Sequence, residues 1–242
     1  MSGKTIVIIP TLNERENVEM LICTLHAQLD ADILVIDDDS PDGTGEFVAK
    51  RAMVDRRIHC IRRVGKRGLG SAYRDGFQWA LAHGYKCIVQ MDADGSHDTS
   101  AVPIMVSGLE TYDVVIGSRY INGGKIVSWP FTRLLVSFLG NFYINAILRI
   151  KNGSYHIHDS TSGFKAWRAS ALQAIQPQLL VSDGYAFQIE TSWRAVDRSL
   201  SVKETPIVFR DRTRGKSKII RSNIMQTFLL PWRLQRAPKN NR

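Results

Sequence analysis

Short apolar runs alternate along the chain with segments whose apolar residues recur at helical spacing. Runs rich in Val and Ile predict buried strands at Lys4–Pro10, Asp32–Asp37, Arg57–Arg62, Lys86–Met91 and Asp113–Gly117. After the first run, the apolar side chains that share one helical face are Val18, Leu21, Ile22, Leu25 and Leu29. A further helix is expected over Gly70–His83. Strands that alternate with helices predict an α/β fold with a mainly parallel sheet covered on both faces.

Polar side chains follow several of the predicted strands at the point where each strand ends. They belong to Thr11–Glu14, Asp37–Asp39, Asp92–Asp94, Ser118 and Arg119. Ligands of parallel sheets bind beyond the carboxyl ends of the strands. Because these ends meet at one edge, the sequence predicts a single binding site that is rich in carboxylates.

Asp92 and Asp94 form the strongest candidate metal site. The two carboxylates stand two residues apart at the end of an apolar strand, so both can turn toward one cation. Oxygen ligands suit Mg²⁺ or Mn²⁺, and a bound diphosphate would complete the coordination shell. The neighbouring His97 is either a partner of these carboxylates or an ordinary loop histidine.

Two other clusters have both a functional and a structural interpretation. Asp38 lies among three adjacent carboxylates and can accept a hydrogen bond from a nucleobase or a ribose. The Ser40–Gly43 segment that follows also fits a turn, which can present Asp38. Thr11–Glu14 fits a capping box, so Glu14 either caps the first helix or faces a ligand. The pattern alone leaves these alternatives open.

Two segments combine glycines with cations. Lys66–Gly70 resembles a phosphate cradle but lacks the P-loop pattern, so its glycines either contact phosphate or permit a tight entry to the next helix. Phe209–Lys218 could close over a diphosphate and stabilise a leaving group. This basic segment has no interleaved aromatic residues, and no nucleic-acid module is visible, so nucleic acid is not expected as a partner.

The net charge of +9 lies at the C-terminal end. Residues 210–242 hold ten Lys or Arg and one acid, whereas the rest of the chain holds 22 basic and 22 acidic residues. This asymmetry predicts an anionic partner, such as a phosphorylated substrate or a membrane.

We expect no secretory signal and no apolar stretch of the roughly 20 residues that span a bilayer. Cys23, Cys60 and Cys87 lack metal-ligand or disulfide spacing and indicate a reducing compartment.

The order and spacing of the motifs resemble those of a known family from about Ile6 to Lys218. The motifs are PTLNERENV, DDDSPDGTG, GKRGLGSAYRDGF, MDADGSH, GSRYINGG, WPFTR, TSGFKAWR, SDGYAFQIE and FRDRTRGKSK. Together they resemble the dolichol-phosphate mannose synthases and their bacterial polyprenol-phosphate counterparts in glycosyltransferase family 2. The resemblance implies the A-type glycosyltransferase fold, with a mainly parallel Rossmann-like sheet.

The resemblance also implies roles for individual residues. Positions that match nucleotide-sugar contacts are Pro10, Leu12, Glu14, Ile36, Asp38, Asp92, Ala93, Arg212 and Lys218. Positions that match acceptor-phosphate contacts are Arg119, Arg133 and Ser137, the last two on a helix after Trp129–Pro130. The implied catalytic residues are Asp94, Arg119, Arg133 and Arg212, and the implied metal ligands are Asp92 and Asp94. The family often has Tyr where Leu12 stands, and Ser96 leaves a third protein ligand open.

By this resemblance the chain transfers mannose from GDP-mannose to a polyprenyl phosphate, with inversion and with Mg²⁺ or Mn²⁺. The alternatives are UDP-glucose or another donor, a soluble acceptor, and a silent protein that binds nucleotide-sugars. We expect a catalytic domain over 1–218 and a basic, partly apolar segment over 219–242, which either binds the membrane interface or packs on the body. The expected location is the cytoplasmic face of a membrane, where a membrane-protein partner is an option.

Overall fold

The computed structural model describes residues 4–65, 68–151, 153, 155–211 and 221–236. Its strands are β1 (Thr5–Thr11), β2 (Asp32–Asp37), β3 (Ile58–Arg62), β4 (Cys87–Gln90), β5 (Val114–Ser118), β6 (Lys125–Val127), β7 (Lys165–Arg168), β8 (Val202–Pro206) and β9 (Val208–Arg210). Its helices are α1 (Arg15–Gln28), α2 (Thr44–Val54), α3 (Leu69–Ala82), α4 (Ala101–Gly108), α5 (Phe131–Lys151), α6 (Ala169–Ala174), the 3-10 turn η1 (Pro177–Leu179), α7 (Gly184–Asp197) and α8 (Arg221–Arg236).

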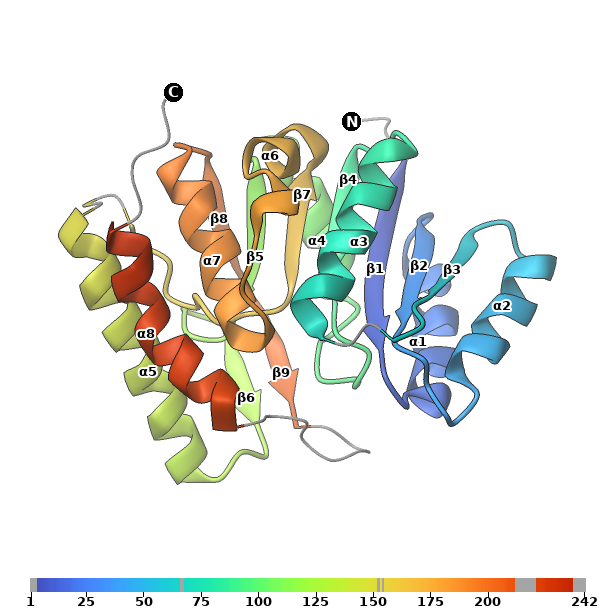
Figure 1. The fold of residues 1–242 in the computed structure, drawn as a ribbon, viewed down its shortest axis with the longest axis horizontal. Coiled ribbons are helices and arrows are strands. Elements are labelled where there is room, and N and C mark those ends of the chain that lie inside the picture. Colours follow the sequence, from blue (N-terminus) through green and yellow to red (C-terminus); the bar gives the residue numbers. More distant parts are fainter. Residues whose placement is uncertain (1–3, 66–67, 152, 154, 212–220, 237–242) are drawn as a thin grey trace.

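The main sheet has the strand order β3-β2-β1-β4-β7-β5-β8, and helices lie on both of its faces (Figure 1). All neighbouring strands run parallel except β7, which pairs antiparallel with β4 and β5. A smaller sheet pairs β6 with β9. The mixed but mainly parallel sheet confirms the predicted α/β architecture.

Alternate residues of the central strands feed two separate hydrophobic clusters. Ile6 and Ile8 of β1 face one cluster, which also contains residues of α3, α5, α6, α7 and α8. Val7 and Ile9 face the other cluster, together with residues of α1, α2 and α4. Because β1 is buried on both faces, its sequence is a continuous apolar run. Each such buried side chain stabilises the fold by about 1.5–3 kcal/mol.

The predicted strands and the first helices form where the apolar patterns place them, within one or two residues. The capping box predicted at the start of α1 does not form. Thr11 belongs to β1, and the residue that caps α1 is Glu14, which makes no side-chain capping hydrogen bond. The backbone N–H of Glu14 instead donates to Thr44 Oγ1 at 3.1 Å, and its carboxylate accepts from Asn17 Nδ2 at 2.7 Å. The turn before α1 is therefore held by contacts with α2.

Strand β7 was not predicted, because its four residues begin and end with a charged side chain, Lys165 and Arg168, and leave only two apolar positions. Lys165 is fully buried, and its Nζ donates to the carbonyl oxygen of Gln188 at 2.7 Å and to Thr191 Oγ1 at 2.9 Å. Burial lowers the pKa of Lys165 to about 7. Tertiary contacts with α7 thus stabilise a polar side chain in the middle of the sheet.

Helices α5 and α8 pack against each other at one end of the molecule (Figure 1). The rings of Tyr143 and Phe228 stack with centroids 4.6 Å apart, and Trp232 Nε1 donates to the Tyr143 hydroxyl at 3.0 Å. Leu230 and Leu234 of α8 are buried in the core. One face of α8 therefore packs on the body. The predicted domain boundary at residue 218 lies outside the described residues.

The expectation that no apolar stretch reaches the length needed to span a bilayer is wrong. Phe131–Ile150 of α5 is long and apolar enough to cross a membrane by length and composition, with a mean hydropathy of 1.3. Only 22% of this stretch is buried inside the protein. The sequence criterion missed it because polar residues such as Ser137 and Asn141 divide the apolar run.

Candidate active site

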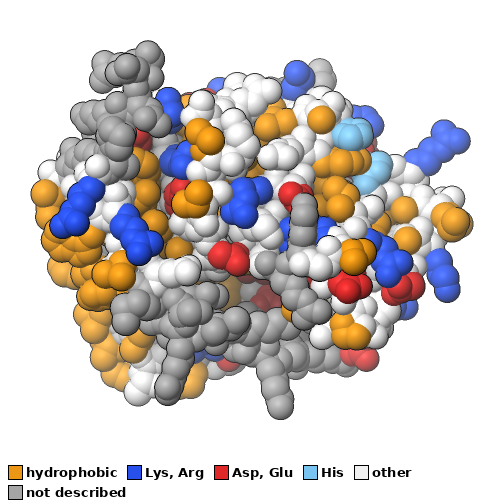
Figure 2. All heavy atoms as spheres, viewed as in Figure 1, with side chains coloured by type: hydrophobic (Ala, Val, Ile, Leu, Met, Phe, Trp, Pro, Cys, Tyr) orange, Lys and Arg blue, Asp and Glu red, His pale blue; other side chains and the backbone are white. Residues whose placement is uncertain are grey.

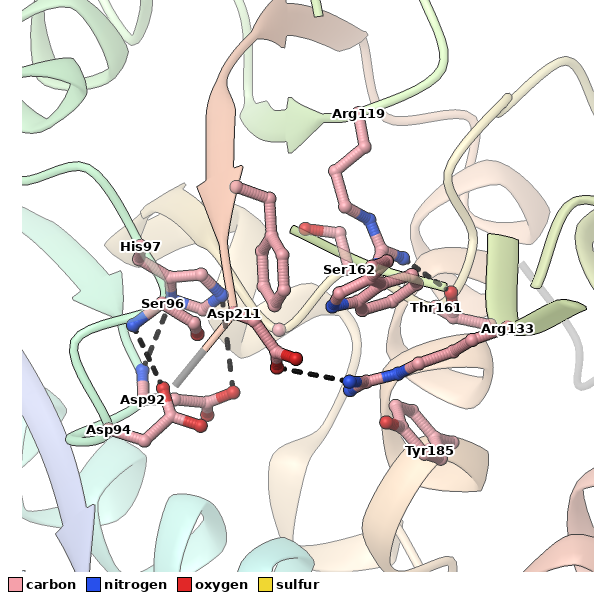
Figure 3. A pocket seen from close by; sticks show the side chains of 13 residues that line it. Asp92, Asp94, Ser96, His97, Arg119, Arg133, Thr161, Ser162, Tyr185 and Asp211 are labelled. Atoms are coloured by element: carbon pink, nitrogen blue, oxygen red, sulfur yellow. Dashed lines mark hydrogen bonds and ion pairs between the residues drawn. The ribbon is translucent and has the colours of Figure 1, made fainter. Parts of the chain in front are cut away.

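A pocket opens where β4, β9 and the start of α5 meet, beyond the carboxyl end of β4 (Figure 3). Its lining residues are Asp92, Asp94, Ser96, His97, Arg119, Trp129, Arg133, Thr161, Ser162, Gly163, Tyr185, Phe209 and Asp211. Asp92, Asp94, Arg119 and Arg133 therefore border one cavity as the sequence predicts, whereas Asp38 and Glu14 do not line it. Figure 3 shows the Asp92 and Asp94 carboxylates on one side and Arg133 on the other, with Asp211 between them.

Buried neighbours fix the two carboxylates of the acidic pair. The hydroxyl of the fully buried Tyr73 donates to Asp92 Oδ1 at 3.1 Å. The N–H of Ser96 donates to Asp94 Oδ1 at 3.1 Å, and the turn that follows β4 is closed in this way. Because these partners are themselves buried, the acidic pair is positioned before any ligand arrives.

His97 is a partner of the acidic pair rather than an ordinary loop histidine. Its ring is buried, stacks on Phe164 with centroids 4.8 Å apart, and accepts a hydrogen bond from the Asp92 N–H at Nδ1, 3.3 Å away. Burial lowers the pKa of His97, although the nearby Asp92 and Asp94 partly oppose this shift. A neutral ring with an unprotonated Nδ1 fits this hydrogen bond.

The acidic pair fits a hard divalent cation. Asp92 and Asp94 supply only carboxylate oxygens, which Mg²⁺ and Mn²⁺ prefer. At Gly163, an added Cβ would lie 3.1 Å from Asp92 Oδ2, so the glycine leaves room for this carboxylate. In the described part of the chain, no three His, Cys, Asp or Glu side chains group so that they could hold a metal ion. Two carboxylates therefore leave most of the coordination shell to phosphate oxygens and water.

Arg119 forms a buried ion pair that the sequence did not predict. Its Nε donates to Asp159 Oδ2 and its Nη2 to Asp159 Oδ1, both at 2.7 Å, and Nη2 also reaches Thr161 Oγ1 at 2.9 Å. Asp159 is fully buried. Burial alone would lower the pKa of Arg119, but the charge and hydrogen bonds of Asp159 outweigh it and raise the pKa. Much of the hydrogen-bonding capacity of this guanidinium is thus committed inside the protein.

Arg133 lies at the rim of the same pocket. Its guanidinium stacks over the Trp129 ring, 4.0 Å from the centroid, and Nη1 donates to Asp211 Oδ1 at 3.0 Å. About a third of each charged side chain is exposed, 39% for Arg133 and 34% for Asp211. Trp129 in turn packs edge-on against Phe209. Arg133 therefore points into the pocket and can reach an incoming anion.

Ser137 follows Arg133 by one turn of α5, but it does not line the pocket. Its Oγ accepts a hydrogen bond from the Tyr120 hydroxyl at 2.7 Å. The structure thus places the predicted acceptor residues at three different positions. Arg133 is at the rim, Arg119 is buried in its ion pair with Asp159, and Ser137 is hydrogen-bonded to a neighbouring tyrosine.

Asp38, a predicted nucleotide contact, is paired inside the protein. Arg63 forms a buried ion pair with it, and the Gly68 N–H donates to Asp38 Oδ2 at 3.0 Å. Gly68 has a positive φ of 126°, and an added Cβ would clash with the Asp183 carboxylate. The glycine before α3 thus permits a tight entry to the helix, which supports its structural interpretation.

The other predicted nucleotide contacts that the structure describes lie along the same edge of the sheet but outside the pocket lining. The side chains of Ile36 and Ala93 are buried in the hydrophobic clusters, whereas those of Pro10, Leu12 and Glu14 are partly exposed at the end of β1. Arg212 and Lys218, and most of the basic segment they belong to, lie outside the described residues.

Sequence reasoning missed Asp159, Tyr185 and Asp211 as residues of the site. Tyr185 stands in a quoted motif, SDGYAFQIE, but no pattern indicated that it lines the pocket. Asp211 stands in the motif FRDRTRGKSK as the single acid of a basic segment, and nothing in that pattern indicates that it lines the pocket. Asp159 follows no strand and belongs to no motif, so only the fold brings it to Arg119.

Comparison with known proteins places the chain among glycosyltransferases. The model of "Glycosyl transferase family 2" matches residues 6–176. A polyprenol monophosphomannose synthase of Mycolicibacterium smegmatis is 42% identical over 226 residues, which cover 92% of this chain and 83% of that protein. An undecaprenyl-phosphate mannosyltransferase of Micrococcus luteus is 40% identical over 217 residues, which cover 89% of this chain and 87% of that protein.

A solved structure shares the fold at low sequence identity. Glucosyl-3-phosphoglycerate synthase from Mycobacterium tuberculosis, in complex with Mn²⁺, UDP and phosphoglyceric acid, aligns with a TM-score of 0.71. The two chains are 18% identical, and the alignment covers 98% of this chain and 80% of the other. The similarity confirms the predicted A-type glycosyltransferase fold.

Proposed function

The chain belongs to glycosyltransferase family 2, and we propose that it transfers mannose from GDP-mannose to the phosphate of a polyprenyl lipid. Two curated relatives at 42% and 40% identity support mannose as the sugar and a lipid phosphate as the acceptor. The observation that carries the proposal is the pocket, in which the Asp92–Asp94 pair faces the rim cation Arg133. One side suits a metal-bound diphosphate, and the other suits a phosphate.

The donor side of the pocket is rich in oxygen ligands. Asp92 and Asp94 would hold a Mg²⁺ or Mn²⁺ ion, which would neutralise the diphosphate as the nucleotide departs. Tyr73 and Ser96 keep the two carboxylates in place through the contacts described above. Rigid placement matters because such stabilisation depends on groups that need no rearrangement during the reaction.

The acceptor side needs a cation rather than a base. A phosphate monoester has its second pKa near 6, so at neutral pH its oxygen is already an anionic nucleophile. Arg133 would hold this phosphate in line with the anomeric carbon, on the face opposite the leaving nucleotide, which gives inversion. The two anions approach each other only if positive charge lies between them, and Arg133 provides that charge at the rim.

A donor screen tests the proposed reaction. The purified protein is incubated with a short polyprenyl phosphate and with GDP-mannose, UDP-glucose or UDP-galactose in the presence of Mg²⁺ or Mn²⁺. We expect polyprenyl-phosphate mannose, detected by mass spectrometry, from GDP-mannose alone. Faster transfer from a UDP-sugar would overturn the donor assignment. If the folded protein forms no product from any of these donors, the result would favour the alternative of a catalytically silent protein that binds nucleotide-sugars.

The proposed location is the cytoplasmic face of a membrane, where the protein binds peripherally through α5 and α8. Apolar side chains gather along the end of the molecule formed by these helices (Figure 2). The exposed large ones are Phe131, Leu134, Leu135, Val136, Phe138, Leu139, Phe142, Ile150, Phe228, Leu229 and Trp232. A continuous exposed patch of this kind is typical of an interaction surface. Because α5 also carries Arg133, the patch would bring the pocket to a lipid head group.

Vesicle flotation tests this location. Removal of 219–242 is a poor test, because Leu230 and Leu234 of α8 belong to the core. We instead expect Phe138→Ser with Phe142→Ser to reduce flotation with anionic vesicles. The matched control replaces Met53 and Val54 by Ser, since these residues are at least as exposed but lie on α2, at the other end of the molecule. Equal flotation of both double variants would contradict attachment through α5.

A further inference from the structure

We propose that Asp211 occupies the place of the acceptor phosphate on Arg133 in the free enzyme and thereby selects for a doubly charged acceptor. The inference rests on the proposed function and adds a specificity-determining residue to it. Arg133 Nη1 donates to Asp211 Oδ1 at 3.0 Å inside the pocket. A carboxylate therefore already lies where an acceptor phosphate would have to bind.

The backbone holds Asp211 in this position. Its N–H donates to the carbonyl oxygen of Val127 at 3.2 Å, which extends the pairing of β6 with β9. The N–H of Arg210 donates to the carbonyl oxygen of Ser96 at 3.1 Å, so the end of β9 is joined to the turn that carries Asp94. The carboxylate is thus attached to a fixed point between the acidic pair and the rim arginine (Figure 3).

Contacts other than those with Asp211 also position Arg133. Its guanidinium lies 4.0 Å from the Trp129 ring centroid, and Trp129 packs against Phe209 with centroids 5.4 Å apart. This aromatic support should keep the guanidinium in the pocket when the carboxylate changes partner. The pair is joined by one short contact and is about a third exposed, so it can open at low cost.

The pairing affects candidate acceptors differently. A neutral hydroxyl interacts more weakly with the Arg133 guanidinium than the Asp211 carboxylate does, so it does not displace Asp211. A phosphate dianion carries more charge and can accept two parallel hydrogen bonds from a guanidinium. It therefore exchanges with Asp211 or shares Arg133 with it, against the repulsion of the nearby carboxylate. Asp211 thus weakens the binding of every anion at Arg133. The acceptors that it excludes most strongly are those that interact only weakly with this arginine.

The test compares Asp211→Asn with the wild type. Asparagine keeps the shape of the side chain and removes its charge. We expect the KM for a short polyprenyl phosphate to fall by up to about fivefold, the upper end of the range for an exposed ion pair. The kcat and the KM for GDP-mannose should change less than the acceptor KM, and inhibition by inorganic phosphate should tighten by a similar factor. The matched control is Glu19→Gln, which removes a half-exposed carboxylate that pairs with Arg15 outside the pocket.

A binding measurement in the Arg133→Gln variant separates this inference from the proposed function. With Arg133→Gln, the Asp211→Asn substitution should no longer affect phosphate binding, as measured by calorimetry with inorganic phosphate alone. That binding measurement stands even if the protein transfers no mannose. Unchanged phosphate binding in Asp211→Asn would overturn the inference. So would a loss of kcat at constant acceptor KM, because Asp211 would then take part in the chemistry itself.

Discussion

Two arginines that line one pocket each pair with an aspartate, and the surroundings of the two pairs differ. Arg119 and Asp159 form two parallel contacts of 2.7 Å, with side chains only 7% and 0% exposed. Arg133 and Asp211 share a single contact of 3.0 Å, with side chains 39% and 34% exposed. Sequence motifs had assigned both arginines to the acceptor phosphate. The comparison shows one pair enclosed by the protein and one pair within reach of solvent, and under our proposal only the second exchanges partners.

The difference follows from desolvation. Separating a buried pair leaves charges without water or partners, so the inner pair should stay closed throughout the reaction. An exposed pair loses little when it opens, because water solvates both groups. Only the rim arginine can change its hydrogen-bond partner at a cost that a substrate readily offsets.

The largest expected effect is on stability, through the inner pair. Asp159→Asn leaves the buried guanidinium of Arg119 without its counter-charge, so the free energy of unfolding should fall by about 3–5 kcal/mol. Asp211→Asn, measured by the same urea titration, should cost no more than about 1 kcal/mol. Equal losses in the two variants would show that burial does not distinguish the pairs.

The next effect is on the rate, through the acidic pair. Asp94→Ala should reduce turnover by about 10²–10³, because it removes electrostatic stabilisation of the leaving diphosphate. The control is Asp98→Asn, because Asp98 accepts hydrogen bonds from Ser100 and does not line the pocket. The unfolding midpoint of Asp94→Ala should stay near that of the wild type. Normal turnover, or activity that EDTA does not affect, would exclude the metal assignment.

A smaller effect is expected at the rim. Arg133→Lys keeps the charge but loses the planar two-pronged donor, so the KM for polyprenyl phosphate should rise by roughly tenfold. The KM for GDP-mannose should change little. Initial-rate kinetics with both substrates varied will separate the two constants. A parallel loss of donor affinity would place Arg133 on the donor side of the pocket instead.

The smallest effect concerns pH. With subsaturating acceptor, the rate should rise as the lipid phosphate loses its second proton near pH 6, and then level off. Burial lowers the pKa of His97, and the midpoint is expected to come from the acceptor rather than from this ring, so His97→Gln should keep it. A phosphonate acceptor with a higher second pKa should move the midpoint upward by the difference between the two pKa values. A pH midpoint that is the same with the phosphate and the phosphonate acceptor would instead indicate that a protein group titrates.

Most of the sheet could be predicted from the sequence, because buried parallel strands are continuous apolar runs that end in polar clusters. The edge that carries Asp92, Asp94 and Arg119 follows from that pattern alone. Strand β7 escaped prediction because Lys165 is solvated by carbonyl and hydroxyl groups of α7, which only the folded chain brings near.

The partners of the site residues could not be predicted in the same way. Asp159 lies 40 residues after Arg119 in a segment without periodicity. Asp211 lies 78 residues after Arg133, among cations that suggested only a basic loop. Motifs identify which residues matter at such a site. Whether a charge is buried and paired, or exposed and exchangeable, depends on packing that no local pattern encodes.

The most direct test of the central claim compares acceptors that differ only in the phosphate. Wild-type protein with GDP-mannose and Mg²⁺ is offered a short polyprenyl phosphate, the corresponding polyprenol and a soluble mannoside, and each product is quantified by mass spectrometry. We predict that mannose is transferred to the polyprenyl phosphate alone, with one GDP released per glycolipid formed. Comparable transfer to the polyprenol or to the mannoside would contradict the account, because Arg133 would then not be selecting a phosphate.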